Sequence, residues 1–445
     1  MEGVKLDMWA YEVRTSSDSC ISAINSYYHQ VLSYGRERSV ILEALVHDKD
    51  CVLANILAAS FLCSSDPSRA SSHIQAAKSH LEQATKYEKA VFDAVIYLIS
   101  QDRDDDVAVE LHFKLLKDFP RDLVSLKRAQ VLCFYMARAD LSLDLVQQVL
   151  PIKQEENYIY GMLAFPLLEL GKMADAEKAA KKGFEINKQD YWAQHALCHV
   201  LQYECHFKEA VEFMEGCSSS WSSCGSFMLT HSWWHVALCY LEGSSPIQRV
   251  YDHCILKELE RSDAACPEVY LNAVGLLLRL YVRGEIDAAG DHLKILAGCL
   301  TDEANWYIEW HFDCLILWAL ASTGELSKAE DLLKGLKSRF SRMSKKKQQL
   351  MHRGMMLAEA LYEYGTGNDK EALQLLGPDF DANNCKVWSS TTELLDQDAP
   401  KSGQYFHILG FMLSITLERA YNLAGRKEAA IIGEKAGALE TAYFK

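Results

Sequence analysis

The sequence predicts an all-α protein, built as a right-handed α-superhelix of antiparallel helix pairs that curls around a concave pocket. Three observations predict this fold. Apolar residues recur with helical spacing between short polar breaks, and runs of alternating β-branched residues are absent. The 445 residues are 49% hydrophobic and include only 8 prolines, which fits a folded helical chain. A turn of the form Gly-x-apolar-x-x-Ala recurs along the second half, as expected of a repeat array.

Residues 1–155 form the first expected region, a series of helical hairpins with degenerate repeats. Polar breaks carry Asp66-Pro67, Phe119-Pro120 and Leu150-Pro151, where a proline ends one helix or begins the next. Strands are not expected in this region. The predicted helices cover residues 18–33, 36–47, 51–63, 69–84, 87–101, 104–118, 122–137 and 140–149.

Residues 156–345 form the second expected region, in which the repeat is legible as tetratricopeptide-like. Small residues allow two helices to approach closely, and a glycine permits the tight turn between them. The first clear copy, at 158–190, places its repeat residues at Tyr160, Ala164, Leu167, Gly171, Met173, Ala176, Gly183 and Phe184. Further turn glycines are Gly284, Gly324, Gly367 and Gly425.

Residues 346–445 form the third expected region, with more helical repeats and a long polar loop at 378–407. A Ser/Gly/Cys-rich stretch at 216–230 is expected to be a linker between two helices. The three regions are expected to form one continuous array, because each helix pair needs the next to bury its apolar face.

Composition excludes several classes of function. The net charge of −15 opposes general binding to nucleic acid or to an anionic membrane, and a basic run at 337–347 is expected to be a solvated helix end. No run approaches the ~20 apolar residues that a membrane span needs. The 14 cysteines include no C-x-x-C, and no secretory leader precedes them, so a reducing, cytoplasmic location is expected. Nucleotide-binding, dinucleotide-binding and esterase motifs are absent.

Two His-x-x-x-His pairs stand out between residues 191 and 243. His195 and His199 form one pair, and His231 and His235 form the other. If both segments are helical, each pair projects from one face of its helix, one turn apart. Either pair could then chelate a metal ion.

In such an array, the first helix of each antiparallel pair lines the concave face. The positions of the turn residues place both histidine pairs on first helices. Asn272, His311 and Asp313 lie on later first helices and are expected to converge on the same pocket. Tryptophans would wall this pocket, although large aromatics more often pack between helices. The expected ligand-binding residues are Trp192, Trp234, Asn272, Trp310 and His311.

Three roles remain open for these histidines. They can pack or contact a ligand without catalysis, they can hold a divalent metal such as Zn, Fe, Ni or Mn, or they can act as acid and base with a carboxylate. The H-E-x-x-H protease motif is absent. The candidate metal ligands are His195, His199, His231 and His235, and the candidate catalytic residues are these four together with Asp313.

The expected function is therefore a cytoplasmic repeat protein whose histidine-rich pocket binds a small molecule or a short peptide, with a non-catalytic role favoured. The alternative is an enzyme, a hydrolase, lyase or isomerase, that uses the histidine cluster for acid–base or metal-assisted chemistry. An open groove with dispersed histidines would favour the first, and converging imidazoles would favour a metal.

The chain resembles the tetratricopeptide repeat protein 38 family along nearly its whole length. The most specific matches are W-A-x-H-A-x-x-H-V at 192–200 and W-H-x-A-L at 234–238. The resemblance implies a helical-repeat fold and a cytosolic location, and it implies no particular activity. The chain departs from the family pattern at Gln202, where the family tends to carry an acidic residue, and at 405–407.

Overall fold

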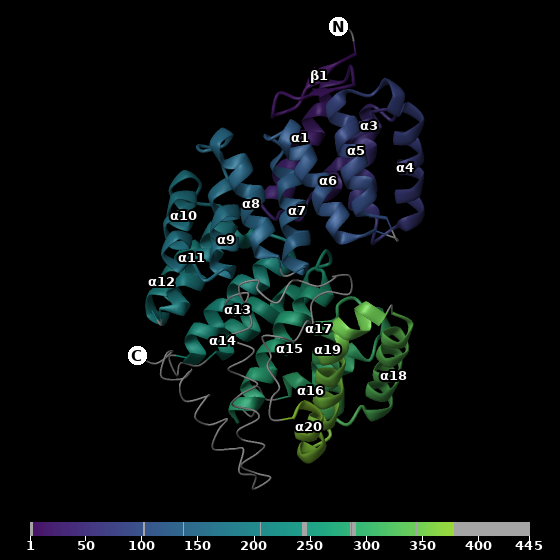
Figure 1. Ribbon diagram of the computed structural model, residues 1–445. Helices are drawn as coiled ribbons and strands as arrows, with labels where there is room; N and C mark the ends of the chain where they lie inside the picture. The colour runs from purple at the N-terminus through teal and green to yellow at the C-terminus, as the bar shows by residue number, and fades with distance from the viewer. Residues whose placement is uncertain are drawn as a thin grey trace. The chain divides into compact units, whose positions relative to one another are not determined.

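The computed structural model describes residues 3–377, apart from 101–102, 137, 205, 243–246, 285, 287–290 and 344. Within these residues the protein is all-α, with helices along almost its whole length (Figure 1). No helix in this part of the chain is both long enough and apolar enough to cross a membrane. The expected loop at 378–407, which includes 405–407, lies outside the described residues, as does Gly425.

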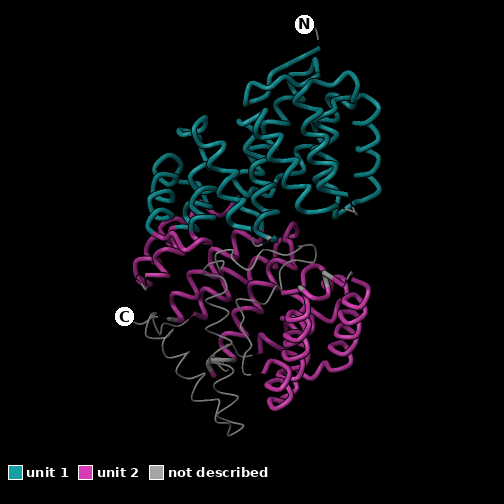
Figure 2. The backbone as a smooth tube through the Cα atoms, in the orientation of Figure 1, with its two compact units in different colours: residues 1–167, 174–196, 223–225 teal, residues 168–173, 197–222, 226–445 magenta. Residues whose placement is uncertain are grey.

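The chain separates into two compact units, coloured teal and magenta in Figure 2. The first unit holds residues 1–167, 174–196 and 223–225, and the second holds residues 168–173, 197–222 and 226–445. The three regions expected at 1–155, 156–345 and 346–445 remain predictions.

Several helices of the first unit begin at capping residues. Asp66 caps a helix with Pro67 in its first turn, and Thr85 and Glu88 form a capping box. The predicted proline signal at Pro67 is therefore confirmed as a helix start. The helices are α1 (Asp18–Leu32), α2 (Ile41–His47), α3 (Val52–Leu62), α4 (Pro67–His80), α5 (Lys86–Leu98), α6 (Asp105–Asp118), α7 (Leu123–Tyr135), α8 (Ala139–Val149), α9 (Ile159–Glu169), α10 (Met173–Ile186) and α11 (Tyr191–Tyr203), of which α9, α10 and α11 include residues of the second unit.

A small hairpin precedes these helices, where no strand was expected. Strands β1 (Lys5–Leu6) and β2 (Glu12–Val13) pair antiparallel. The Asp7 carboxylate accepts hydrogen bonds from the backbone N–H groups of Trp9 and Tyr11, both at 2.9 Å, and Ala10 has a φ of 60°. The Asp7 side chain stabilises the turn between the two strands. Each strand is 2 residues long, so neither leaves an alternating pattern in the sequence.

In the second unit, alternate helices pack in a row. Helix α13 packs against α15, α15 against α17, and α17 against α19, while the helices between them pack against their neighbours in sequence. The helices are α12 (Phe207–Cys217), α13 (Ser226–Glu242), α14 (Gln248–Val250), α15 (Cys266–Arg283), α16 (His292–Leu300), α17 (Trp310–Ser322), α18 (Leu326–Arg342), α19 (Lys345–Gly365) and α20 (Asp369–Leu376). A π-helix at Tyr251–Ile255 continues α14.

The turn glycines named from the repeat pattern adopt the left-handed conformation wherever the structure describes them. This backbone conformation costs a residue with a Cβ atom, so the pattern and the geometry agree. The φ values are 71° at Gly171, 74° at Gly284, 87° at Gly324 and 80° at Gly367.

The stretch at 216–230 is helical for most of its length, so the expected linker is wrong. Helix α12 runs to Cys217, a 3-10 helix covers Ser218–Ser223, and α13 already begins at Ser226. Trp221 is buried, and this large apolar side chain holds the stretch in the fold although serines surround it.

Candidate functional site

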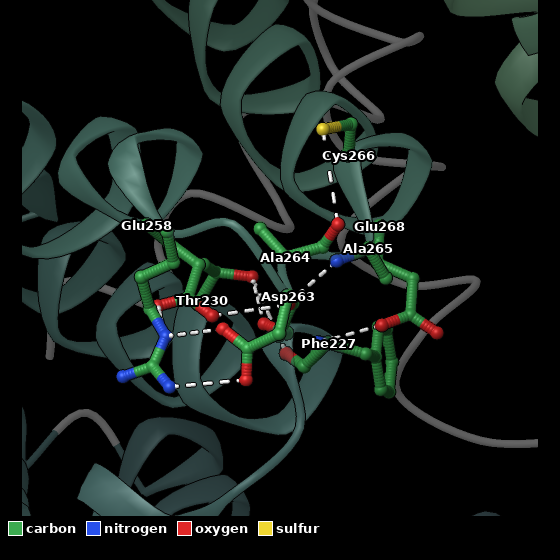
Figure 3. A network of polar contacts seen from close by, with 10 residues as sticks. Phe227, Thr230, Glu258, Asp263, Ala264, Ala265, Cys266 and Glu268 are labelled. Carbon is green, nitrogen blue, oxygen red and sulfur yellow. Dashed lines mark hydrogen bonds and ion pairs between the residues drawn. The ribbon is translucent and has the colours of Figure 1, made fainter. Parts of the chain in front are cut away.

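The N-terminus of α13 is fixed by a polar network with the segment that leads into α15 (Figure 3). The Ser226 hydroxyl donates to the buried Glu258 carboxylate at 2.9 Å and accepts from the backbone N–H of Ala265 at 2.9 Å. The backbone N–H of Phe227 donates to Glu268 at 2.8 Å. A carboxylate at a helix N-terminus satisfies an amide that has no partner within the helix. These contacts fix the start of the helix that carries His231 and His235.

His231 and His235 lie one turn apart on α13 and face each other. Their Nε2 atoms are 3.2 Å apart, and their rings meet edge to face with centroids 4.7 Å apart. Both side chains are buried, His231 at 5% exposure and His235 at 0%. The predicted convergence of this pair on one helix face is confirmed.

The side-chain amide of Asn272, on α15, orients the His231 ring through its Nδ1 atom. Its amide nitrogen donates to the Thr230 hydroxyl at 2.8 Å and to the Glu268 carbonyl at 3.0 Å. Both amide hydrogens are therefore engaged, and the amide oxygen lies 3.2 Å from His231 Nδ1. An amide oxygen only accepts, so Nδ1 of His231 carries the hydrogen of this bond.

Gln202 of α11 holds His235 in the same way. Its oxygen lies 2.9 Å from His235 Nδ1, and its nitrogen donates to the His235 carbonyl at 3.3 Å and to the Cys239 sulfur at 3.2 Å. His235 Nδ1 therefore also carries a hydrogen. Three helices, α11, α13 and α15, contribute to one buried chain of hydrogen bonds.

Aromatic side chains flank His231. Its ring is nearly parallel to those of Phe227, at 5.0 Å, and Trp234, at 5.3 Å, and the guanidinium of Arg279 lies 4.7 Å from the Trp234 ring. Burial lowers the pKa of His231 to about 4, the hydrogen bond to Asn272 opposes this shift, and the charge of Arg279 adds to it. His231 is therefore neutral near pH 7.

The other two histidines of the predicted set are divided between the units. His199 belongs to the second unit, and its buried ring meets that of His235 edge to face at 4.5 Å. His195 belongs to the first unit, where its buried ring stacks on half-buried Trp192 at 5.1 Å and on Phe165 at 6.0 Å. Along α11 the two lie one turn apart, as the spacing predicts.

The start of α17 carries the other predicted residues. His311 is half-buried. Desolvation of its ring lowers its pKa to about 4, and the charge of Arg279 adds to this shift. Asp313 is buried and accepts the backbone N–H of Tyr307 at 2.8 Å, and burial raises its pKa to about 7. Trp310 is also buried, and its indole N–H donates to the Gly354 carbonyl at 3.1 Å. Asp313 and Trp310 thus have identified structural contacts, and the catalytic role of Asp313 and the ligand contact of Trp310 remain predictions.

Sequence reasoning gave no site role to Gln202, Thr230 and Arg279. Gln202 follows His199 by three residues and so shares its helix face. Arg279 follows Asn272 by seven residues, two turns along α15. Helical spacing from a suspected site residue is the signal that could have found both.

A search of known protein-family models finds none that matches this chain.

Proposed function

We propose that this chain is a tetratricopeptide-like repeat protein whose second unit binds a small molecule or an ion at the His231–His235 pair, without catalysis. The repeat assignment is supported by the row of alternate helices α13, α15, α17 and α19 and by the left-handed turn glycines. The resemblance to the tetratricopeptide repeat protein 38 family and the cytoplasmic location belong to the same proposal.

One observation carries the binding role: two buried imidazoles point at each other, and each is oriented by an amide from a different neighbouring helix. Burying polar groups costs free energy that hydrogen bonds only roughly offset. An apolar core would pack α13 against its neighbours at lower cost. The arrangement therefore fits a site that needs imidazole nitrogen.

The burial of the two histidines also restricts the class of ligand that can bind them. A peptide in an open groove would need exposed contact residues, whereas His231 and His235 are 5% and 0% exposed. The proposal therefore favours a small molecule or an ion over a short peptide.

Native mass spectrometry of the purified, untagged protein tests this proposal. We expect a bound species on the wild-type chain that is lost in His231→Gln and in His235→Gln. His112→Gln is the matched control, because His112 is fully buried in the first unit and its Nδ1 contacts the Ala108 carbonyl at 2.8 Å. A chain that carries no ligand, or equal retention in all three variants, would contradict a binding role for the pair.

The competing interpretation is a polar network that serves only to specify the core. Chemical denaturation of the same variants separates the two. If the network is only structural, replacing either histidine should lower the stability strongly, and the wild-type protein should carry no bound species. A binding site predicts loss of the ligand in variants whose ligand-free stability stays close to that of the wild type.

A further inference from the structure

We infer that the ligand of the pair is a transition-metal ion, bound by Nε2 of His231 and Nε2 of His235. This inference rests on the proposed binding function and names its ligand. It follows from where the hydrogens of the two rings must be.

A neutral imidazole carries one hydrogen on its two nitrogens. The oxygens of Asn272 and Gln202 face the two Nδ1 atoms at 3.2 and 2.9 Å, so each ring places its hydrogen there. Both Nε2 atoms are then acceptors, and they lie 3.2 Å apart. Two acceptors at this distance repel each other unless a proton or a metal ion lies between them.

Reversing one amide would move a ring hydrogen to Nε2 and relieve this repulsion, but only by bringing the amide oxygen against a carbonyl oxygen. Turning Gln202 over would bring its oxygen to 3.3 Å from the carbonyl oxygen of His235. Turning Asn272 over would bring its oxygen to 3.0 Å from the Glu268 carbonyl oxygen, and near a Thr230 hydroxyl that already donates to the Ser226 carbonyl at 2.7 Å. The orientations in the structure are those that satisfy both amides.

The geometry fits a metal ion. Two bonds of about 2.0–2.1 Å to one metal at a tetrahedral angle separate the two nitrogens by about 3.3–3.4 Å, and the Nε2 atoms are 3.2 Å apart. Histidines that bind metals commonly donate their other N–H to an oxygen, as both rings do here. Imidazole ligands favour Zn, Ni, Cu and Fe over Mg or Ca.

Gln202 and Asn272 are then positioning residues, which act on the metal through the rings they orient. Replacing either should weaken metal binding without removing a ligand, by about 10- to 100-fold. Gln202→Glu keeps an oxygen acceptor opposite Nδ1 but loses the amide donor to the His235 carbonyl and to Cys239, so it should bind zinc more tightly than Gln202→Ala and less tightly than the wild type.

The probe is Zn²⁺ added to untagged, chelator-stripped full-length protein, with bound zinc measured by plasma mass spectrometry and affinity by competition with a chromophoric chelator. We expect about one equivalent on the wild type, with loss in His231→Gln and His235→Gln and retention in His112→Gln. Circular dichroism establishes that each variant is folded. If a histidine variant does not fold, the difference between Gln202→Ala and Gln202→Glu tests the same inference.

The outcomes separate this inference from the proposed function. A bound organic species that depends on His231 and His235, with no zinc uptake, overturns the metal and leaves the binding function intact. No bound species and no zinc uptake overturns both. Equal zinc binding by the wild type and all variants places the metal elsewhere and overturns the assignment to this pair.

Discussion

Asn272 joins two helices to one imidazole ring. Its amide nitrogen bonds to Thr230 on α13 and to the Glu268 carbonyl on α15, and its oxygen bonds to His231. Because the residue is 5% exposed, bulk water does not compete for these bonds in the folded protein. A single amide therefore determines both the tautomer of His231 and the satisfaction of its neighbours.

We expect Asn272→Ala to lower the free energy of unfolding by about 1–3 kcal/mol, because it leaves buried polar groups without partners. Urea denaturation measures this change. Asn305→Ala is the control, since Asn305 is also buried but its amide makes one long hydrogen bond, of 3.5 Å to the Asp302 carbonyl. Equal losses in the two variants would show that the Asn272 network adds nothing beyond the burial of an amide.

Asp313 is a carboxyl group whose burial raises its pKa from an ordinary 3.8 to about 7. A raised folded-state pKa means that the folded protein binds more protons than the unfolded chain between those two values. Stability from this group is therefore present at acidic pH and is lost as pH rises from about 4 through about 7.

We expect Asp313→Asn to raise the free energy of unfolding at pH 8 by an amount of order 1–4 kcal/mol, and to leave it nearly unchanged near pH 4. The amide oxygen of asparagine can still accept the Tyr307 N–H, so the hydrogen bond at the start of α17 is kept. Denaturation at several pH values measures the effect. A variant that is less stable than the wild type at pH 8 would show that Asp313 is ionised and favourably paired there.

At the scale of elements, α17 and α19 approach closely because a glycine lies at their contact. A Cβ atom on Gly365 would lie 2.7 Å from the Ala321 Cβ and 3.0 Å from the Trp318 carbonyl oxygen. Gly275, inside α15, is a contrasting case, since the nearest atom to its Cβ would be 3.7 Å away, in Leu315. One glycine is required by helix packing, and the other is not.

Gly365→Ala is expected to destabilise the protein by about 1–3 kcal/mol, because the backbones of α17 and α19 must move apart. Gly275→Ala is expected to stabilise it by about 0.5–1 kcal/mol, since alanine is the better helix former. Thermal or chemical melts of the two variants measure the pair. A Gly365→Ala variant as stable as Gly275→Ala would refute a tight α17–α19 contact.

Helical periodicity predicted the elements well, and the turn glycines within the described residues were assigned correctly because only glycine adopts their backbone conformation without strain. Periodicity missed β1 and β2, which are two residues long, and it read 216–230 as a linker because serines outnumber the buried Trp221. The facing of His231 and His235 followed from spacing within one helix. The hydrogen bond between His235 and Gln202 spans 33 residues of sequence, and only the folded structure brings these two residues together.

At the scale of the whole molecule, metal binding is expected to stabilise the second unit and not the first. Gln202, His231, His235 and Asn272 all belong to the second unit. A ligand that binds only the folded state stabilises it by RT ln(1 + [L]/Kd), about 2.7 kcal/mol at a free concentration of 100 Kd. That stabilisation should slow the opening of the helices that hold the ligand.

Hydrogen exchange with and without Zn²⁺ tests this directly. We expect zinc to slow exchange in α13 and α15 by up to about 100-fold at 100 Kd, because His231, His235 and Asn272 lie on these helices. Helices α3 to α6, within the first unit, should exchange unchanged, and the His235→Gln variant should show no zinc effect in either unit. Uniform slowing along the chain would instead indicate zinc bound at many surface groups, and slowing confined to the first unit would place the metal away from the histidine pair.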